Sequence, residues 1–251
     1  MTRRLTPRPT PYNLPNHPAK GRMKLLLETR DVGRVTIVRC QGRIIAGNET
    51  ETLRAHVAWL LRDRRALVFH LGDVTFIDSS GLGTMVRALT STRQARGDLK
   101  LCEVPDHVRK VLELSHLNKL FESHDSEDNA VAAFYRVPTQ SAPAAKAAHS
   151  VLCIERNPDV AACLREALRN AGYDVHTTNS LRDALILMRV TRFDVLLVGH
   201  GLTAPPATEK IFRDACSSLP VIELGGEFST AEAGQAASEL LQKISARLQV
   251  H

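Results

Sequence analysis

The residues with the clearest chemical potential lie in one short block, Asp78-Ser79-Ser80-Gly81-Leu82-Gly83. The block follows a strand-like run and precedes an amphipathic helical pattern, which places it at a helix N-terminus. Such a terminus offers unpaired N–H groups and the positive end of the helix dipole, so it can hold an anion. A phosphate on a serine here would gain donors and add about −1.5 to −2 charges to the surface. The alternative is that Ser79 or Ser80 simply caps the helix.

Enzymatic interpretations of this block have little support. Neither serine lies in GxSxG, and Val86 occupies the place of the third glycine of GxGxxG. The five cysteines form no CxxC pair, and the ten histidines form no HExxH or HxH motif. An odd cysteine count without framework spacing is typical of reduced thiols in a cytosolic protein. We therefore expect a protein that is not an enzyme and that needs no metal or cofactor.

Composition divides the 251-residue chain into four parts. Residues 1–22 carry five basic residues, five prolines and no acidic residue, which predicts a disordered tail rather than a DNA-binding face. Residues 137–148 are rich in Ala and Pro and favour a flexible linker. The regions on either side of the linker, 23–136 and 149–251, both have the size of a domain. No signal peptide and no apolar run of roughly 20 residues is present, so we expect a cytoplasmic protein without membrane contact.

The region 23–136 has the pattern of a mixed α/β domain. Strand-like runs at 23–29 and 35–40 flank a turn and predict a β-hairpin. Helical and strand patterns then alternate, which favours a largely parallel sheet with packed helices. In chain order these are a helix at 50–63, a strand at 66–71, a helix from Leu82 to Gly97, a strand at 99–104, a helix at 105–114, a short strand at 121–123 and a helix at 126–134.

The region 149–251 predicts a second α/β domain. Its strand-like runs number about four, and helical patterns separate them. The strands are expected at 151–154, 173–177, 195–198 and 220–224, with a terminal helix from about Thr230 to Leu248.

The segment FIDSSGLGTMVRA resembles the STAS domain of anti-sigma factor antagonists, as do GDV before it and LKLCEV and VRKVLELSHLNKLFE after it. The resemblance covers about residues 23–136. It implies that Ser79 is phosphorylated by an anti-sigma factor that is also a serine kinase of the GHKL type. Unphosphorylated protein would bind that partner and release a sigma factor, and a phosphoserine phosphatase would reverse the modification. The implied partner surface comprises Asp78, Ser80, Gly81, Leu82 and Gly83.

One position departs from the pattern of that family. Many members carry an aspartate in a G-x-[IL]-D sequence, and here Gly42-Arg43-Ile44 is followed by Ile45. The resemblance places this loop near the phosphoacceptor, so the departure bears on the identity of the partner more than on the fold.

The region 149–251 resembles a degenerate receiver domain of a response regulator. Val151–Ile154 followed by Glu155 matches the opening strand and acidic turn of that family. Arg156 stands where the resemblance requires a second Mg²⁺-binding carboxylate, and Gly199 stands at the phosphoacceptor position. Gly225 replaces the hydroxyl residue. We expect a pseudo-receiver that accepts no phosphate and serves docking or self-association; the alternative is an α/β domain of other ancestry.

These expectations combine into a phosphorylation-switched antagonist that binds an anti-sigma factor and does not bind DNA directly. The alternative is a STAS scaffold or ligand-binding module whose serine is never phosphorylated and whose second domain mediates assembly.

Overall fold

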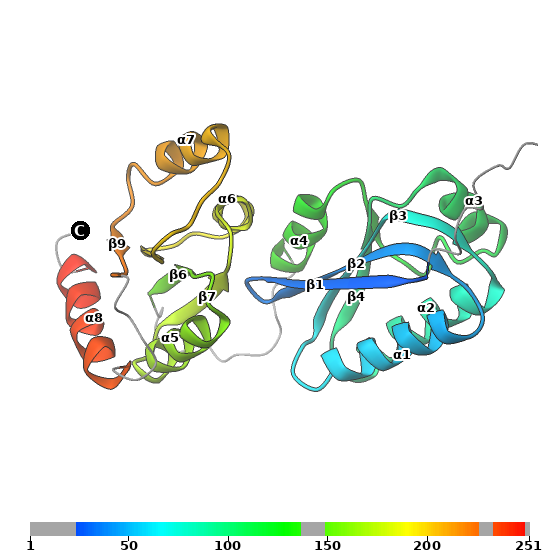
Figure 1. The fold of residues 1–251 in the computed structure, drawn as a ribbon, viewed down its shortest axis with the longest axis horizontal. Helices are drawn as coiled ribbons and strands as arrows, with labels where there is room; N and C mark the ends of the chain where they lie inside the picture. Colours follow the sequence, from blue (N-terminus) through cyan, green and yellow to red (C-terminus); the bar gives the residue numbers. More distant parts are fainter. Residues whose placement is uncertain (1–23, 137–148, 226–232, 249–251) are drawn as a thin grey trace, which may run out of the picture.

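The computed structural model describes residues 24–136, 149–225 and 233–248, which fold into two α/β domains (Figure 1). The predicted tail at 1–22 and the predicted linker at 137–148 lie outside the described residues. Each domain has its own sheet. This confirms the predicted fold class, a mixed α/β sheet with packed helices followed by a second α/β domain.

The first domain is built on a five-stranded mixed sheet. In sheet order, the strands are β1 (Leu26–Val32), β2 (Val35–Ile44), β3 (Ala66–Ile77), β4 (Asp98–Cys102) and β5 (Ser123–His124). The helices are α1 (Asn48–Leu60), α2 (Ser79–Gln94), α3 (Asp106–Leu114) and α4 (Glu127–Arg136). β1 and β2 form the predicted antiparallel hairpin, and β2 to β5 pair in parallel.

β2 and β3 are longer than the sequence pattern predicts. Their register shifts twice, between Arg39 and Gln41 and between Gly42 and Arg43, and β3 contributes the extra residue each time. Such bulges break the alternation of inward and outward side chains. The strand pattern in the sequence is therefore interrupted at Gly72 and Asp73, two residue types that are uncommon in strands, although β3 continues to Ile77.

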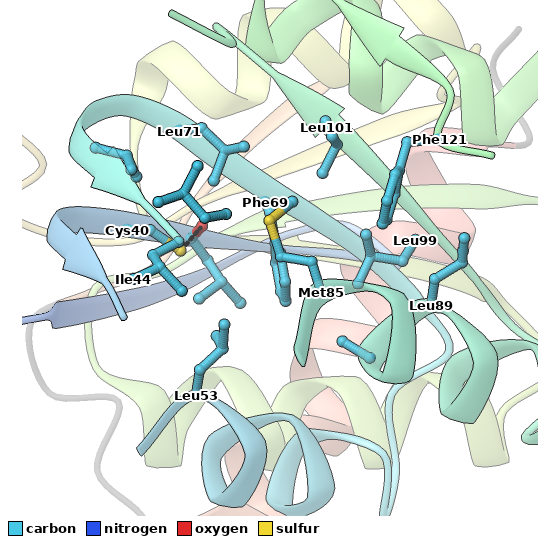
Figure 2. Close-up of a cluster of buried hydrophobic side chains, with 14 of the residues drawn as sticks. Cys40, Ile44, Leu53, Phe69, Leu71, Met85, Leu89, Leu99, Leu101 and Phe121 are labelled. Carbon is cyan, nitrogen blue, oxygen red and sulfur yellow. Dashed lines mark hydrogen bonds between the residues drawn. The ribbon is translucent and has the colours of Figure 1, made fainter. Parts of the chain in front are cut away.

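α1 and α2 cover one face of this sheet around Phe69. Figure 2 shows Phe69 beside Met85 of α2, with Leu89 further along the same helix and Leu53 on α1, and all four belong to one buried cluster. All four side chains are at most 1% exposed. Burial of each such side chain stabilises the fold by about 1.5–3 kcal/mol. This apolar layer holds α2 against β3 and so fixes where the strand ends and the helix begins.

The opposite face of the sheet is covered by α4 over its amino-terminal half. Ala130 and Val131 of α4 pack with Val35, Ile37 and Val68 in one buried cluster. These strand residues come from the first half of β2 and of β3, so the carboxyl-terminal halves extend beyond α4.

The second domain has a four-stranded parallel sheet. Its strands are β6 (Ser150–Ile154), β7 (Asp174–Thr178), β8 (Val195–Val198) and β9 (Val221–Glu223), and its helices are α5 (Pro158–Asn170), α6 (Leu181–Val190), α7 (Pro206–Ala215) and α8 (Ala233–Leu248). The sheet order is β7-β6-β8-β9. This is the first part of the 2-1-3-4-5 order of doubly wound folds, and in the described residues the sheet ends at the fourth strand.

A buried ion cluster joins the two domains. The Arg30 guanidinium of β1 donates to Glu127 at the start of α4 and to Asp183 in α6. The side chains of Glu127 and Asp183 are only 7% and 3% exposed. The Gly33 N–H in the hairpin turn also donates to the Thr177 carbonyl of β7 over 3.1 Å. Arg30 is thus the cation that two buried carboxylates from different domains share.

Apolar and aromatic contacts extend this domain interface. Val32 beside the hairpin turn belongs to the same buried cluster as Leu187 of α6. The Tyr135 hydroxyl lies 3.2 Å from Nδ1 of His176 in β7. Figure 1 shows the second domain beside the tip of the β1–β2 hairpin and α4. That tip is at the amino end of β2, so the second domain sits at the end of the sheet opposite to Ser79.

Candidate functional site

The predicted phosphoacceptor lies at the surface, at the carboxyl end of β3. β3 ends at Ile77, and Ser79 is the first residue of α2. Ser79 and Ser80 are both exposed, whereas Asp78 is half-buried. The strand-to-helix junction expected from the sequence therefore presents two accessible hydroxyls.

Asp78 caps α2, and the alternative that a serine caps this helix is wrong. The Asp78 carboxylate accepts the Gly81 N–H over 2.8 Å and the Ala46 N–H over 2.9 Å. The first bond satisfies a free donor of the helix, and the second fastens the loop after β2 to the start of α2. Ile45, which replaces the family's aspartate, precedes Ala46 and is half-buried in this loop.

The cap also sets the charge beside Ser79. Burial alone would raise the pKa of Asp78. The N–H donors of Ala46, Gly81 and Ser80 and the charge of Arg43 lower the pKa by more than burial raises it, so the Asp78 pKa lies below its usual value. Asp78 is therefore ionised at neutral pH. Its carboxylate already accepts the Gly81 N–H, one of the helix donors that a phosphate on Ser79 could use. The expectation that a phosphate on Ser79 gains helix donors stays a prediction.

We expect Asp78→Ala to lower the free energy of unfolding by about 0.5–2 kcal/mol at pH 7, the usual cost of losing an N-cap. Because the folded-state pKa is lowered, this stabilisation is present above the unfolded pKa of about 3.9 and is lost as the pH falls through the folded value. Denaturant unfolding from neutral to acidic pH should show the gap between wild type and variant narrowing below about pH 4. If the difference in unfolding free energy between wild type and Asp78→Ala did not change with pH, Asp78 would not be an ionised cap of α2.

The two glycines of the block have different roles. A Cβ on Gly81 would lie 2.2 Å from the Ile44 carbonyl oxygen, whereas a Cβ on Gly83 would meet nothing within 4 Å. Gly81 thus permits β2 to approach α2 within the chain, and Gly83 leaves the surface open. Leu82 is only 7% exposed and packs in the core. The predicted partner surface is therefore narrower than the sequence suggests, because Gly81 and Leu82 face inward.

The structure adds two neighbours that the sequence pattern did not indicate. Arg43 and Phe76 are paired across β2 and β3, and the Arg43 guanidinium lies 5.2 Å from the Phe76 ring centroid. Phe76 is 47% exposed. Phe76 lies beyond the two bulges, where the sequence pattern does not predict a strand, so no sequence signal indicates that it lies on the surface of β3.

At the corresponding end of the second sheet, Gly199 stands next to the Glu155 carboxylate. A Cβ on Gly199 would lie 2.2 Å from Oε2 of Glu155, which fills that space while its other oxygen accepts the Asn157 N–H over 2.8 Å. Arg156 reaches the Gly201 carbonyl over 3.4 Å. A side chain at position 199 would therefore require the Glu155 carboxylate to move.

We expect acetyl phosphate with Mg²⁺ to leave the second domain unmodified, because Gly199 offers no nucleophile and Arg156 repels a cation. Intact-mass analysis followed by peptide mapping of residues 149–251 is the measurement. An acyl phosphate on any aspartate of this segment would show that the pseudo-receiver interpretation is wrong.

All five cysteines lie within the described residues. The five cysteines are free thiols, and burial raises the pKa of Cys40 and Cys153 to about 12. No group of three or more His, Cys, Asp or Glu side chains in the described ranges could hold a metal ion. No helix in the part of the chain that the structure describes is long and apolar enough to cross a membrane.

Comparisons with known proteins identify the family of the first domain. The family model of the STAS domain matches residues 27–130. The chain is 32% identical over 113 residues to a Bordetella bronchiseptica protein named as an anti-sigma factor antagonist, BtrV, covering 45% of this chain and 95% of that protein. It is 29% identical over 111 residues to the anti-sigma F factor antagonist of Paenibacillus polymyxa, covering 43% and 94%. The chain belongs to the STAS-domain family of anti-sigma factor antagonists.

Solved structures of the same description are also similar. The unphosphorylated anti-sigma factor antagonist SpoIIAA has 20% sequence identity and a TM-score of 0.40, with 45% of this chain and 99% of that chain covered. An anti-sigma factor antagonist from Mycobacterium paratuberculosis has 23% identity and a TM-score of 0.40, with 44% and 93% covered. The STAS family model ends at residue 130, before the second domain begins.

Proposed function

We propose that this protein is a phosphorylation-switched anti-sigma factor antagonist. Unphosphorylated, its STAS domain binds an anti-sigma factor that is also a serine kinase of the GHKL type, and the sigma factor is released. Phosphorylation of Ser79 by that kinase ends the binding, and a phosphoserine phosphatase restores it. The protein itself catalyses no reaction. The observation that carries the proposal is the exposure of Ser79 as the first residue of α2, directly beside the ionised cap Asp78.

The geometry explains how a phosphate on Ser79 would act. Asp78 already accepts the Gly81 N–H, so the phosphate would project from the surface rather than bind the helix terminus. It would add about −1.5 to −2 charges next to an existing carboxylate. Partner binding would enclose these like charges in a partly desolvated interface, where such repulsion costs several kcal/mol. The phosphate therefore works by repulsion and not by a large change of fold.

The position of the second domain supports this proposal. It contacts the hairpin turn through Gly33 and Thr177, at the amino end of β2. Ser79 follows the carboxyl end of β3, so a partner can reach it while both domains remain in contact. The region resembling a receiver domain would then act as a docked, non-signalling module.

Phosphosite mapping tests the proposal. The full chain is incubated with ATP and GHKL-type serine kinases, and the modified peptide is sequenced by mass spectrometry. We expect phosphate on Ser79, unchanged phosphorylation of Ser80→Ala and none of Ser79→Ala. Phosphate on Ser80 alone would move the switch by one residue. No phosphate on either serine would favour the alternative of an unphosphorylated STAS scaffold or ligand-binding module.

A further inference from the structure

The carboxyl-terminal half of the outer sheet face is left open by α4. β2 alternates regularly, so Arg39, Gln41 and Arg43 share the face on which Val35 and Ile37 pack under α4. Arg39 is exposed, whereas Gln41 and Arg43 are half-exposed. The same sheet face therefore changes from a buried apolar surface to an accessible one about halfway along the strands.

Two large apolar side chains lie on this accessible surface. Phe76 is 47% exposed, and Leu26, which pairs with Gln41 across β1 and β2, is 53% exposed. We call Leu26, Gln41, Arg43 and Phe76 the open sheet face. A shallow hollow of about 660 Å³ adjoins it, lined by Arg39, Gln41, Gly72, Asp73, Val74, Thr75 and His107. Exposed apolar side chains that gather on one face are typical of protein-binding surfaces.

Arg43 provides the charge of this face. Its guanidinium lies over the Phe76 ring, and no ion pair to it is found among the described residues. By contrast, Arg39 on the same strand is held by Asp73 over 2.7 Å. An arginine stacked on an aromatic ring keeps its donors available for a carboxylate.

The open sheet face is continuous with the Ser79 surface. Phe76 precedes Ser79 by three residues, and the Asp78 N–H donates to the Ile44 carbonyl, next to Arg43 in β2, over 3.2 Å. The charge of Arg43 also contributes to the lowered pKa of Asp78. A protein that covers Ser79 thus has the open sheet face within reach.

We propose that the open sheet face is the second half of the interface for the anti-sigma factor, with Phe76 as its apolar anchor and Arg43 as its cationic anchor. The inference rests on the proposed function. The matching surface of the partner is an apolar pocket with a carboxylate at its rim. Aromatic and arginine side chains supply most binding energy in interfaces of this kind.

The chain contains a matched control for this pair. Trp59 of α1 is 51% exposed, and the Arg64 guanidinium lies 5.5 Å from its ring centroid. Trp59 is near the carboxyl end of α1, just before β3 begins, so it lies at the opposite end of the sheet from Ser79. Trp59 is thus an exposed aromatic side chain stacked by an arginine, outside the proposed interface. Arg64 differs from Arg43 in being paired with Asp31 and Asp63.

The test is isothermal titration of the full chain with the kinase that phosphorylates Ser79 in vitro. Phe76→Ala and Arg43→Ala should each weaken binding at least about tenfold, whereas Trp59→Ala should change it less than twofold. Phe76→Leu, which retains an apolar side chain, should lose less than Phe76→Ala. Circular dichroism melting confirms that each variant is folded, as expected for substitutions of half-exposed residues.

The outcomes separate this inference from the proposed function. If Ser79→Asp weakens binding but Phe76→Ala and Arg43→Ala do not, the open sheet face is not part of the interface and the switch stands. If Phe76→Ala and Arg43→Ala weaken binding but Ser79→Asp does not, the open sheet face is part of the interface and Ser79 is not the switch. If Phe76→Ala instead turns a dimer into a monomer in analytical ultracentrifugation, the face binds a second copy of this chain and the inference is overturned. Absence of binding by the wild-type chain to every kinase tested would overturn both.

Discussion

Arg30→Met is expected to lower the free energy of unfolding by about 3–5 kcal/mol, the range for removing one partner of a buried ion pair. Arg30 bridges Glu127 and Asp183, whose side chains are 7% and 3% exposed. Without the guanidinium, two carboxylates remain buried with their solvation lost. Arg182 is 3.9 Å from Glu127 and 71% exposed, so it compensates little. Nε2 of His70 lies 3.8 Å from Glu127 and carries a charge only when protonated, and neither group forms an ion pair with Asp183 among the described residues.

Urea unfolding followed by two probes measures this effect. Trp59 is the single tryptophan and reports on the first domain, whereas circular dichroism reports on both domains. The wild type should unfold with coincident transitions, and Arg30→Met should unfold earlier and with separated transitions, because the domains no longer stabilise each other.

Arg39→Met is the matched control, because the Arg39–Asp73 pair is 46% and 44% exposed. It should cost at most about 1 kcal/mol. In the Arg30→Met background, Asp183→Asn should recover part of the loss by removing a buried charge. Equal effects of the two arginine substitutions would show that the domain contact contributes no more than a surface pair.

Gly81→Ala is expected to destabilise the first domain by about 1–3 kcal/mol, the usual cost of overpacking. The added methyl would lie 2.2 Å from the Ile44 carbonyl oxygen, and a backbone atom in a paired strand cannot move aside easily. β2 or α2 must shift, which strains the Asp78 bonds to Ala46 and Gly81 as well.

Gly83→Ala, two residues further in the same helix, should have the opposite effect. A Cβ there meets nothing within 4 Å, and alanine favours a helix over glycine by about 0.5–1 kcal/mol. Thermal melts of both variants measure the difference. If Gly81→Ala is as stable as Gly83→Ala, the close approach of β2 to α2 is not a constraint of the fold.

The elements could be predicted from the sequence wherever a regular apolar period reaches a buried face. The stripe of Leu82, Met85 and Leu89 predicts α2, and each of these residues lies in the core. The ends of β2 and β3 could not be predicted, because the bulges interrupt the alternation. The domain contact was missed for another reason: Arg30 and Asp183 are 153 residues apart, and nothing local marks them as partners.

The candidate site was predicted in position but not in detail. The strand-to-helix junction and the exposure of Ser79 follow from local pattern. Asp78 caps α2 through the local Gly81 N–H, a role that the sequence allowed because aspartate is a favoured N-cap. Its second bond, to the Ala46 N–H, required knowledge of where the loop after β2 lies, which is a tertiary property. The inward orientation of Gly81 has the same origin, since the carbonyl that excludes its Cβ belongs to β2.

The most direct test of the proposed switch compares Ser79→Asp with Ser79→Ala in affinity for the kinase that phosphorylates Ser79. Ser79→Asp places a second negative charge beside Asp78, so we expect binding at least about tenfold weaker than for Ser79→Ala, which corresponds to about 1.4 kcal/mol. Ser91→Asp adds the same charge to an exposed position of α2 about three turns away and should leave affinity unchanged. Equal binding by the two Ser79 variants, with the wild-type chain binding in the same assay, would contradict the assignment of Ser79 as the switch.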